Sequence, residues 1–363
     1  MKIEGIRCFY SEKLFIIQII SDTGLSGWGE CSAMQVNGSL ALLKSALARD
    51  LIGQDIFNAA EIERRCLRQH YKYSGQLLAM TFSGIDMALW DLRGKAVGLP
   101  LYALFGGKCR DSVPMYASSM TRNLSIQQEC EKIAHAVREG GFGCVKIKIG
   151  PRMGTQEILD IRSDIQKVRA VRETIGEARE LMVDANSAYT AAQAVQLHKL
   201  LEPYRILVYE EPCSYEDLEA YEFVSKRITT PVNWGEQNWN LYTLRDFLLR
   251  GAVQVVAFDA TKCGGLTQLL RAETLCRAFN VNLAPHNTSV GLGTAAHLQV
   301  IAASPQATGF QEFNIEVPKA FYLKKPFQVT QGQLTVPNEP GLGVEIDEDA
   351  LYANTSVTYF SHS

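Results

Sequence analysis

Seven polar residues recur at nearly even spacing along the C-terminal two-thirds of the chain, and each one ends an apolar run. They are Lys148, Asp184, Glu210, Glu236, Asp259, His286 and Glu312. The intervals between them are 36, 26, 26, 23, 27 and 26 residues. Each interval has room for one strand, one helix and two short loops. Because charged groups that end successive parallel strands of a closed barrel meet at one mouth, the set suggests metal-assisted proton transfer.

Three of these residues are carboxylates on neighbouring predicted strands. Asp184 follows LMV, Glu210 follows LVY and Glu236 follows WG. Hard oxygen ligands of this kind suit Mg²⁺ and leave positions open for substrate and water. A single acid at a strand end could instead cap the next helix. Three acids at equal spacing favour the metal site.

Two lysines, Lys146 and Lys148, lie two residues apart in the predicted strand CVKIKI. Their side chains therefore point to the same face of the strand. Two close ammonium groups repel, and each disfavours protonation of the other, which predicts a neutral lysine base near neutral pH. The alternative is that one of the two is a surface residue at the strand end.

Asp259 and His286 end adjacent predicted strands and are expected to lie within hydrogen-bonding range. A carboxylate on one ring nitrogen fixes the histidine tautomer and raises the basicity of the other nitrogen. This pair is the second candidate acid/base group. No other histidine of the chain ends a predicted strand.

Strand-like runs alternate with amphipathic helices through the middle of the chain, which indicates a (β/α)8 barrel. We expect its strands at 112–119, 144–149, 181–186, 207–211, 232–236, 253–260, 281–287 and 308–313. Residues 1–110 read as a strand meander followed by helices and form an α+β capping domain. The barrel then covers 111–316. The segment 317–363 is strand-like without the barrel period and is expected to return to the capping domain.

Composition excludes several classes of protein. The net charge is −3, from 36 basic and 39 acidic residues, which argues against a nucleic-acid or membrane-surface protein. No apolar run approaches the roughly 20 residues of a membrane span. We see no signal stretch and expect a cytoplasmic protein with its nine cysteines reduced.

Together these residues resemble the enolase superfamily and, within it, the mandelate racemase subgroup. Segments similar to the capping domain of that family are SGWGECS, SGIDMALWDLRGK and PGLGVEI. Its barrel motifs are matched in order and spacing by VKIKIG, VDAN, YEEP, WGE, FDATKCGG and APHN. The resemblance covers essentially the whole chain. It implies a modified, enolase-type (β/α)8 barrel with an α+β N-terminal capping domain.

The resemblance also implies a role for each candidate residue. The implied Mg²⁺ ligands are Asp184, Glu210 and Glu236. Lys148, with Lys146 beside it, would be one acid/base group, and His286, paired with Asp259, would be the other, on the opposite face of the substrate. Glu312 would be a carboxylic acid that hydrogen-bonds the substrate carboxylate. The muconate-lactonizing subgroup has a lysine where this chain has Asp259.

Substrate contacts are predicted from two further features. Asn186 stands where some sugar-acid dehydratases of the family carry a histidine, which disfavours that class, and we place Asn186 at the substrate. Only about five residues join the first two strands, so the family's usual lid looks truncated. We predict that Met34 lines the pocket as an apolar wall and Gln35 as a polar contact. The alternative for both is a solvated strand–helix connection.

The function expected from the resemblance is Mg²⁺-dependent removal of the proton α to a carboxylate, giving an enolate. Dehydration of an acid sugar, an aldonate or aldarate, to a 2-keto-3-deoxy acid is favoured. A sugar-lactone cycloisomerase or a racemase would use the same atoms, and a non-catalytic barrel is the alternative of another class. The expected partners are a small carboxylate substrate and further copies of the chain, with no nucleic acid and no membrane.

Overall fold

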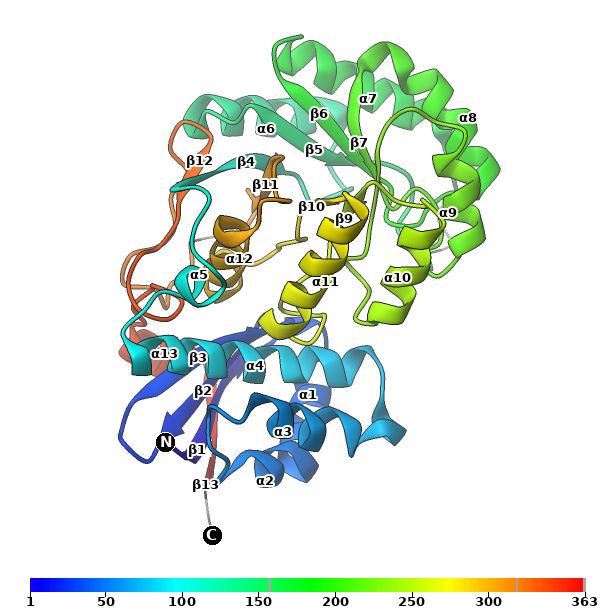
Figure 1. The fold of residues 1–363 in the computed structure, drawn as a ribbon. Helices are drawn as coiled ribbons and strands as arrows, with labels where there is room; N and C mark the ends of the chain where they lie inside the picture. The colour runs from blue at the N-terminus through cyan, green and yellow to red at the C-terminus, as the bar shows by residue number, and fades with distance from the viewer. Residues whose placement is uncertain (156–157, 318, 362–363) are drawn as a thin grey trace.

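The computed structural model describes residues 1–155, 158–317 and 319–361, and Figure 1 shows two domains, one above the other. Positions 318, 362 and 363 of the predicted C-terminal segment lie outside the described residues. The lower domain in that view is an antiparallel sheet with helices. The upper domain is a set of parallel strands surrounded by helices.

The capping domain is built on a sheet whose strand order is β13-β1-β2-β3. Its strands are β1 (Ile3–Ser11), β2 (Leu14–Ser21), β3 (Ser26–Cys31) and β13 (Ser356–Ser361). Its helical segments are η1 (Ala33–Gln35), α1 (Val36–Leu42), η2 (Leu43–Leu47), α2 (Ala48–Leu51), α3 (Ala59–Glu63), η3 (Arg64–Arg68), η4 (Tyr71–Tyr73) and α4 (Gln76–Val97). Helix α4 packs directly on β3. The approach is so close that a Cβ at Gly29 would lie only 2.1 Å from the Gly84 carbonyl oxygen, so the position requires glycine.

The upper domain confirms the predicted barrel. Its parallel strands are β4 (Ser112–Ser118), β5 (Cys144–Lys148), β6 (Glu180–Asp184), β7 (Ile206–Glu210), β8 (Val232–Trp234), β9 (Val255–Val256), β10 (Asn282–Leu283) and β11 (Gln311–Asn314). Helices outside them are α5 (Leu101–Leu104), α6 (Ile126–Gly140), α7 (Ile161–Ile175), α8 (Ala191–Leu201), η5 (Glu202–Tyr204), α9 (Leu218–Ser225), α10 (Leu241–Leu249), α11 (Leu266–Phe279) and α12 (Leu292–Ala303). Strand order follows the chain from β4 to β10, and β11 pairs with β4 on its other side. The sheet therefore curls back toward its first strand.

The seam between β10 and β11 is bridged by contacts other than a strand ladder. The Leu283 amide donates to the Gln306 carbonyl at 3.2 Å, and the Thr308 hydroxyl lies 2.8 Å from Asn282 Oδ1. The predicted strands at 253–260 and 281–287 are much shorter in the structure. Their polar ends leave the ladder and turn into the loops at the barrel mouth.

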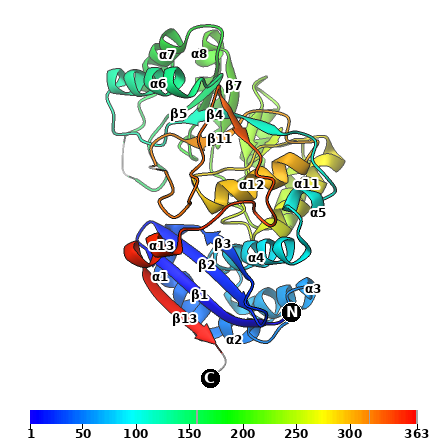
Figure 2. The ribbon, with the colours of Figure 1, turned by 90° about the vertical axis from the view of Figure 1, so that its left-hand side faces the viewer.

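The C-terminal segment serves both domains. Strand β12 (Gln333–Thr335) pairs antiparallel with β4 of the barrel, whereas β13 pairs antiparallel with β1 of the capping sheet. Figure 2 shows β13 running along β1 at the edge of that sheet, next to α13 (Glu348–Asn354). The return to the capping domain was predicted, but the pairing with the barrel was not. None of the described helices is long and apolar enough to cross a membrane.

Candidate active site

Strand register brings the predicted polar residues into one row at the barrel mouth. Lys148 of β5 lies opposite Asp184 of β6, which in turn lies opposite Glu210 of β7. Glu236 follows β8 after Gly235, whose φ of 125° favours glycine and turns the chain at this point. The spacing seen in the sequence is therefore the spacing of strand ends.

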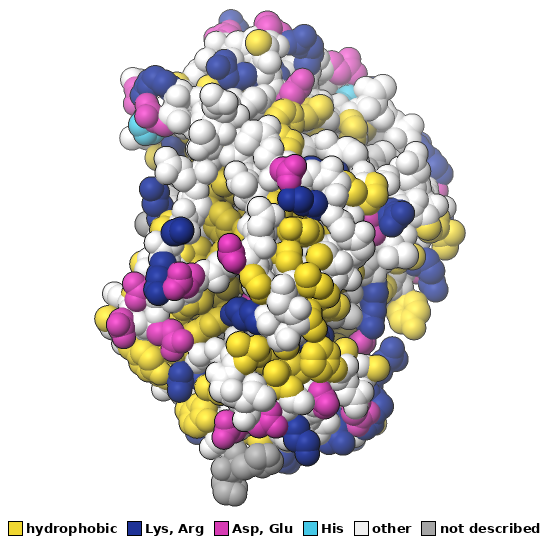
Figure 3. All heavy atoms as spheres, turned by 60° about the vertical axis from the view of Figure 1, so that its left-hand side comes forward, with side chains coloured by type: hydrophobic (Ala, Val, Ile, Leu, Met, Phe, Trp, Pro, Cys, Tyr) yellow, Lys and Arg dark blue, Asp and Glu magenta, His cyan; other side chains and the backbone are white. Residues whose placement is uncertain are grey.

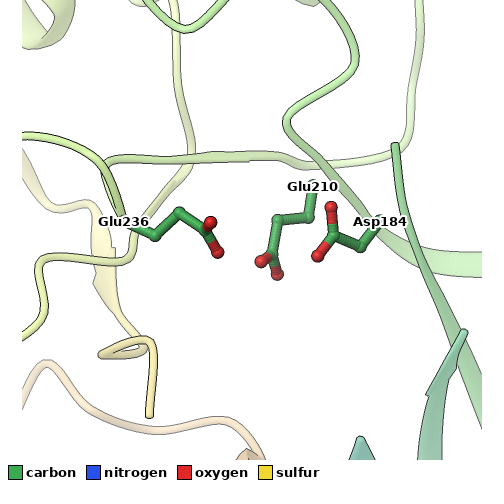
Figure 4. A group of neighbouring side chains, drawn as sticks. All are labelled: Asp184, Glu210 and Glu236. Atoms are coloured by element: carbon green, nitrogen blue, oxygen red, sulfur yellow. The ribbon is translucent and has the colours of Figure 1, made fainter. Parts of the chain in front are cut away.

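The three carboxylates of Asp184, Glu210 and Glu236, which we call the acid triad, face a common space. Each offers an oxygen within 4.8 Å of the others, and all three side chains are buried. Figure 4 shows Glu210 between the other two, with the side chain of Glu236 extending toward them. Buried carboxylates are costly unless a cation compensates them, and three hard oxygen donors suit a divalent ion. Within the described residues, Oε2 of Glu236 accepts no hydrogen bond, although His286 Nε2 lies 3.2 Å away, so this oxygen is open to a cation and the triad fits a metal.

Both predicted lysines point into the site and contact these acids. Lys148 Nζ donates a short hydrogen bond to Asp184 Oδ2. Lys146 Nζ lies 2.9 Å from Glu210 Oε2, 2.9 Å from Glu312 Oε1 and 3.8 Å from Asp184 Oδ2. The alternative that either lysine is a surface residue is excluded, because both are buried.

The protonation of these lysines differs from the expectation. Burial alone would lower the pKa of Lys148, and the charge of Lys146 lowers it further, but the carboxylates of Asp184, Glu236 and Glu210 together raise it above its usual value. Burial would also lower the pKa of Lys146, but the charges of Glu210 and Glu312 raise it well above its usual value. The predicted repulsion is therefore present, but the prediction that it leaves a neutral lysine is wrong for this arrangement of carboxylates.

The histidine–aspartate pair has the expected geometry. His286 Nδ1 lies 2.8 Å from Asp259 Oδ2. The other oxygen of Asp259 accepts from the amide and the hydroxyl of Thr261, at 2.7 and 2.8 Å. Burial would raise the pKa of Asp259, but the hydrogen bond and charge of His286 hold it below its usual value. His286 Nε2 lies 3.2 Å from Glu236 Oε2, so the free ring nitrogen faces the acid triad.

Glu312 lies within β11, two residues before its end, and both of its carboxylate oxygens accept hydrogen bonds. Its Oε1 accepts from the Ser118 hydroxyl at 2.7 Å, and its Oε2 accepts from the Asn287 amide at 2.8 Å. Burial would raise the pKa of Glu312, but nearby cations, Lys146 first, hold it at about 2. The role implied for Glu312, a hydrogen bond to the substrate carboxylate, stays a prediction.

The predicted substrate contacts lie around the mouth. Asn186 has a positive φ of 41°, and its Oδ1 accepts from the Arg122 guanidinium at 3.0 Å, so this oxygen already has a protein partner. Met34 and Gln35 lie on η1 and are exposed, Met34 by 55 %. The Ser32 amide, just before them, donates to the Thr261 carbonyl at 3.0 Å, which brings this segment to the loop that follows Asp259. Only residues 12 and 13 separate β1 from β2, a shorter link than expected.

A supporting network behind Lys148 was missed in the sequence. Arg122 Nε donates to the Gly150 carbonyl at 2.9 Å, and Asp164 accepts from the Gly150 amide at 2.8 Å. Lys167 Nζ lies 3.3 Å from the Lys148 carbonyl. These side chains fix the turn after β5. No motif marks them, because each acts on backbone groups that carry no side-chain signal.

Comparisons with known proteins agree over almost the whole chain. Residues 6–106 match the family "Mandelate racemase / muconate lactonizing enzyme, N-terminal domain", and residues 129–350 match the family "Enolase C-terminal domain-like". The D-galactarolactone cycloisomerase of Agrobacterium fabrum (strain C58) is 33 % identical, over 93 % of this chain and 89 % of that protein. The D-galactonate dehydratase of Pectobacterium atrosepticum is 30 % identical, over 97 % of this chain and 94 % of that protein. A crystal structure of a putative racemase from Roseobacter denitrificans superposes with a TM-score of 0.93 at 27 % identity and covers 100 % of both chains.

Proposed function

The chain belongs to the mandelate racemase/muconate lactonizing enzyme family of the enolase superfamily, and on that premise we propose that it removes the proton α to the carboxylate of an acid sugar. The proposed outcome is Mg²⁺-dependent dehydration of an aldonate or aldarate to a 2-keto-3-deoxy acid. Relatives named as sugar-acid dehydratases support the substrate class. The residues at the barrel mouth support the half-reaction.

One observation carries the proposal: the two acid/base groups contact opposite ends of the acid triad. Lys148 hydrogen-bonds Asp184 at one end, and His286 Nε2 lies 3.2 Å from Glu236 at the other. A carboxylate substrate held over the triad would have a different proton-transfer group on each side. That arrangement serves removal of a proton on one face and delivery of a proton on the other.

The triad of Asp184, Glu210 and Glu236 would hold the Mg²⁺. When bound, the ion supplies positive charge that stabilises negative charge developing on the substrate carboxylate. Lys148 would lose its proton once the charge of the triad carboxylates is shared with the ion, and its neutral Nζ then takes the α-proton. His286, protonated at Nε2 and held by Asp259 at Nδ1, gives its proton to the departing β-hydroxyl, which leaves as water. The enol that remains becomes the 2-keto-3-deoxy acid on tautomerisation.

A cycloisomerase is the second candidate, and the relative at 33 % identity is named for that reaction. This reaction needs the same α-proton transfer. The second bond that changes joins the β-carbon to a ring oxygen, whereas in dehydration it joins the β-carbon to a free hydroxyl. The residues at the mouth suit both outcomes. The difference lies in which oxygen the substrate presents to His286.

A substrate screen separates these outcomes. We would incubate the protein with D-galactonate, D-gluconate, D-galactarolactone and other mono- and diacid sugars, with and without Mg²⁺. A product that reacts with semicarbazide, formed from an open-chain sugar acid, indicates dehydration. Consumption of a lactone without a matching hydrolysis product indicates cycloisomerisation. No reaction together with no Mg²⁺ binding would contradict the proposal and favour a non-catalytic barrel.

We also propose that the protein forms a homo-oligomer. Figure 3 shows hydrophobic side chains gathered across the middle of one face, with a few charged side chains among them and more around them. Large exposed apolar areas commonly mark contact surfaces. Light scattering over a range of concentrations tests this proposal, and a monomer at every concentration would contradict it.

A further inference from the structure

One carboxylate of the capping domain reaches into the barrel beside the candidate active site. Glu30 lies on β3, and its Oε2 accepts three hydrogen bonds from distant segments. The donors are the Ser289 hydroxyl at 2.8 Å, the Gly293 amide at 2.9 Å and the Tyr322 hydroxyl at 3.1 Å. The Gly293 amide belongs to the first turn of α12, where unpaired amides and the helix dipole favour an anion.

The segment held by Glu30 is the one that follows His286. Residues 287–291 join His286 to α12, and their internal bonds lead back to the site. The Thr294 hydroxyl donates to the Ser289 carbonyl at 2.7 Å and accepts from Asn287 Nδ2 at 2.9 Å. The Asn287 amide in turn donates to Glu312. Glu30 is therefore connected through this loop to both His286 and Glu312.

The same end of β3 also holds the loop that follows the dyad aspartate. The Ser32 amide donates to the Thr261 carbonyl at 3.0 Å, and Thr261 donates twice to Asp259. Glu30 of β3 and Ser32, the first residue after β3, thus hold the two loops that follow His286 and Asp259. The packing leaves little freedom, because a Cβ at Gly293 would lie 2.8 Å from the Ser289 side chain and 3.0 Å from Thr261.

We propose that Glu30 is a positioning residue for the His286–Asp259 pair, through which docking of the capping domain sets the geometry of the second proton transfer. The expected effect of Glu30 on the rates of product formation and α-proton exchange rests on the proposed function. Lys148 is supported by a separate network at Gly150, just after β5, where Arg122 and Asp164 of α7 hold the backbone, so Glu30 should act on the histidine step and not on the lysine step.

Three variants test the inference. Glu30→Ala removes the acceptor of all three bonds. Glu30→Gln keeps a carbonyl oxygen, and because all three donors meet one oxygen, it should rescue the geometry. Glu63→Ala is the matched control, because Glu63 of α3 forms an ion pair with Arg271 of α11 at 2.7 Å, another contact between capping domain and barrel.

Two readouts are followed in each variant. The first is amide hydrogen–deuterium exchange by mass spectrometry over the loop 287–293 and over the turn at 149–151. The second is the ratio of product formation to exchange of the α-proton, with the sugar acid turned over in the screen. Glu30→Ala should speed amide exchange at 287–293 only and lower product formation at least about tenfold more than α-proton exchange, by analogy with residues that orient metal-ligating histidines. Glu30→Gln should stay close to wild type.

The inference would be overturned by unchanged amide exchange at 287–293 in Glu30→Ala, by equal loss of both chemical rates, or by equal damage in Glu30→Ala and Glu30→Gln. The same pattern in Glu63→Ala would also overturn it, because it would show a general effect of domain contact. The amide-exchange readout needs no substrate. A wild-type protein that turns over no acid sugar would therefore contradict the proposed function while the role of Glu30 is still tested.

Discussion

The barrel and the capping domain meet at the candidate active site and contribute to it in different ways. The barrel supplies its groups from the ends of consecutive parallel strands, so that Lys148, Asp184 and Glu210 stand in one row. The capping domain supplies contacts from the end of one antiparallel strand, where Glu30 of β3 and Ser32 just after it hold loops of the barrel. The barrel therefore carries the groups of the proposed reaction, whereas the capping domain contacts the loops that follow Asp259 and His286.

The largest effect should follow from a change in the acid triad on the barrel side. Glu236→Gln should lower Mg²⁺ affinity, measured by calorimetry, and reduce turnover on the order of 10³-fold or more, because several kcal/mol of charge stabilisation is lost. Circular dichroism should show an intact fold. Wild-type activity of this variant at ordinary Mg²⁺ would rule out Glu236 as a ligand.

A smaller and more selective effect is expected from the histidine of the dyad. His286→Asn should lose product formation by roughly 10²–10⁴-fold, the usual contribution of a general acid. Slow exchange of the α-proton through Lys148 should persist and can be followed by proton NMR in D₂O. Exchange lost in His286→Asn but kept in Lys148→Ala would reverse the assignment of the abstracting base.

The contact between the two domains predicts a dependence of stability on pH. Asp86 of α4 accepts from the amide and hydroxyl of Thr267 on α11, at 2.8 and 2.6 Å. Burial raises the pKa of Asp86 from 3.8 to about 6, although the Thr267 hydrogen bonds and the charge of Arg93 oppose the shift. The folded state therefore binds this proton more tightly than the unfolded state does. The resulting stability is full below about pH 4 and is lost as the pH rises through 6.

Asp86→Asn removes this titration and is the test of that dependence. Relative to wild type, the variant should gain free energy of unfolding between pH 4 and pH 7, by up to about 3 kcal/mol. Urea unfolding of both proteins at the two pH values measures the difference. A gap between variant and wild type that is the same at both pH values would show that Asp86 does not titrate in this range.

The smallest effect should come from the exposed part of the capping side. Met34→Ala should raise KM a few-fold and leave kcat nearly unchanged, since loss of a partly exposed apolar contact costs about 1 kcal/mol. Leu249→Ala, an exposed residue on α10, is the control. Equal KM values in the two variants would support a solvated connection at η1 instead of a pocket wall.

The sequence predicted the barrel better than it predicted the capping side, and the reason is physical. A strand that ends in a polar residue at each repeat leaves a local pattern, so the strands and their order could be derived from spacing. Strands β9 and β10 are shorter than predicted because the residues near Asp259 and His286 leave the ladder to form hydrogen-bonded loops. Glu30 left no signal, because its partners lie 259 to 292 residues away along the chain.

The charge state of the two lysines could not be predicted from the sequence either. The two-residue spacing of Lys146 and Lys148 predicts their repulsion, but only the folded site shows that Asp184, Glu210 and Glu312 outweigh it. A pKa depends on every charge within reach, and most of these come from other strands. The C-terminal segment is a second example. The strand-like sequence at 326–346 did not reveal that β12 pairs with β4.

Solvent deuterium exchange tests the central claim most directly. The wild-type protein is incubated in D₂O with D-galactonate, D-gluconate or D-galactarolactone, with Mg²⁺ and after its removal by chelation, and the proton α to the carboxylate is followed by NMR. The account predicts loss of that proton signal from at least one compound, dependent on Mg²⁺ and abolished in a Lys148→Ala, His286→Asn double variant. Retention of the signal in every compound with Mg²⁺ bound, or its loss at an unchanged rate in the double variant, would contradict the account.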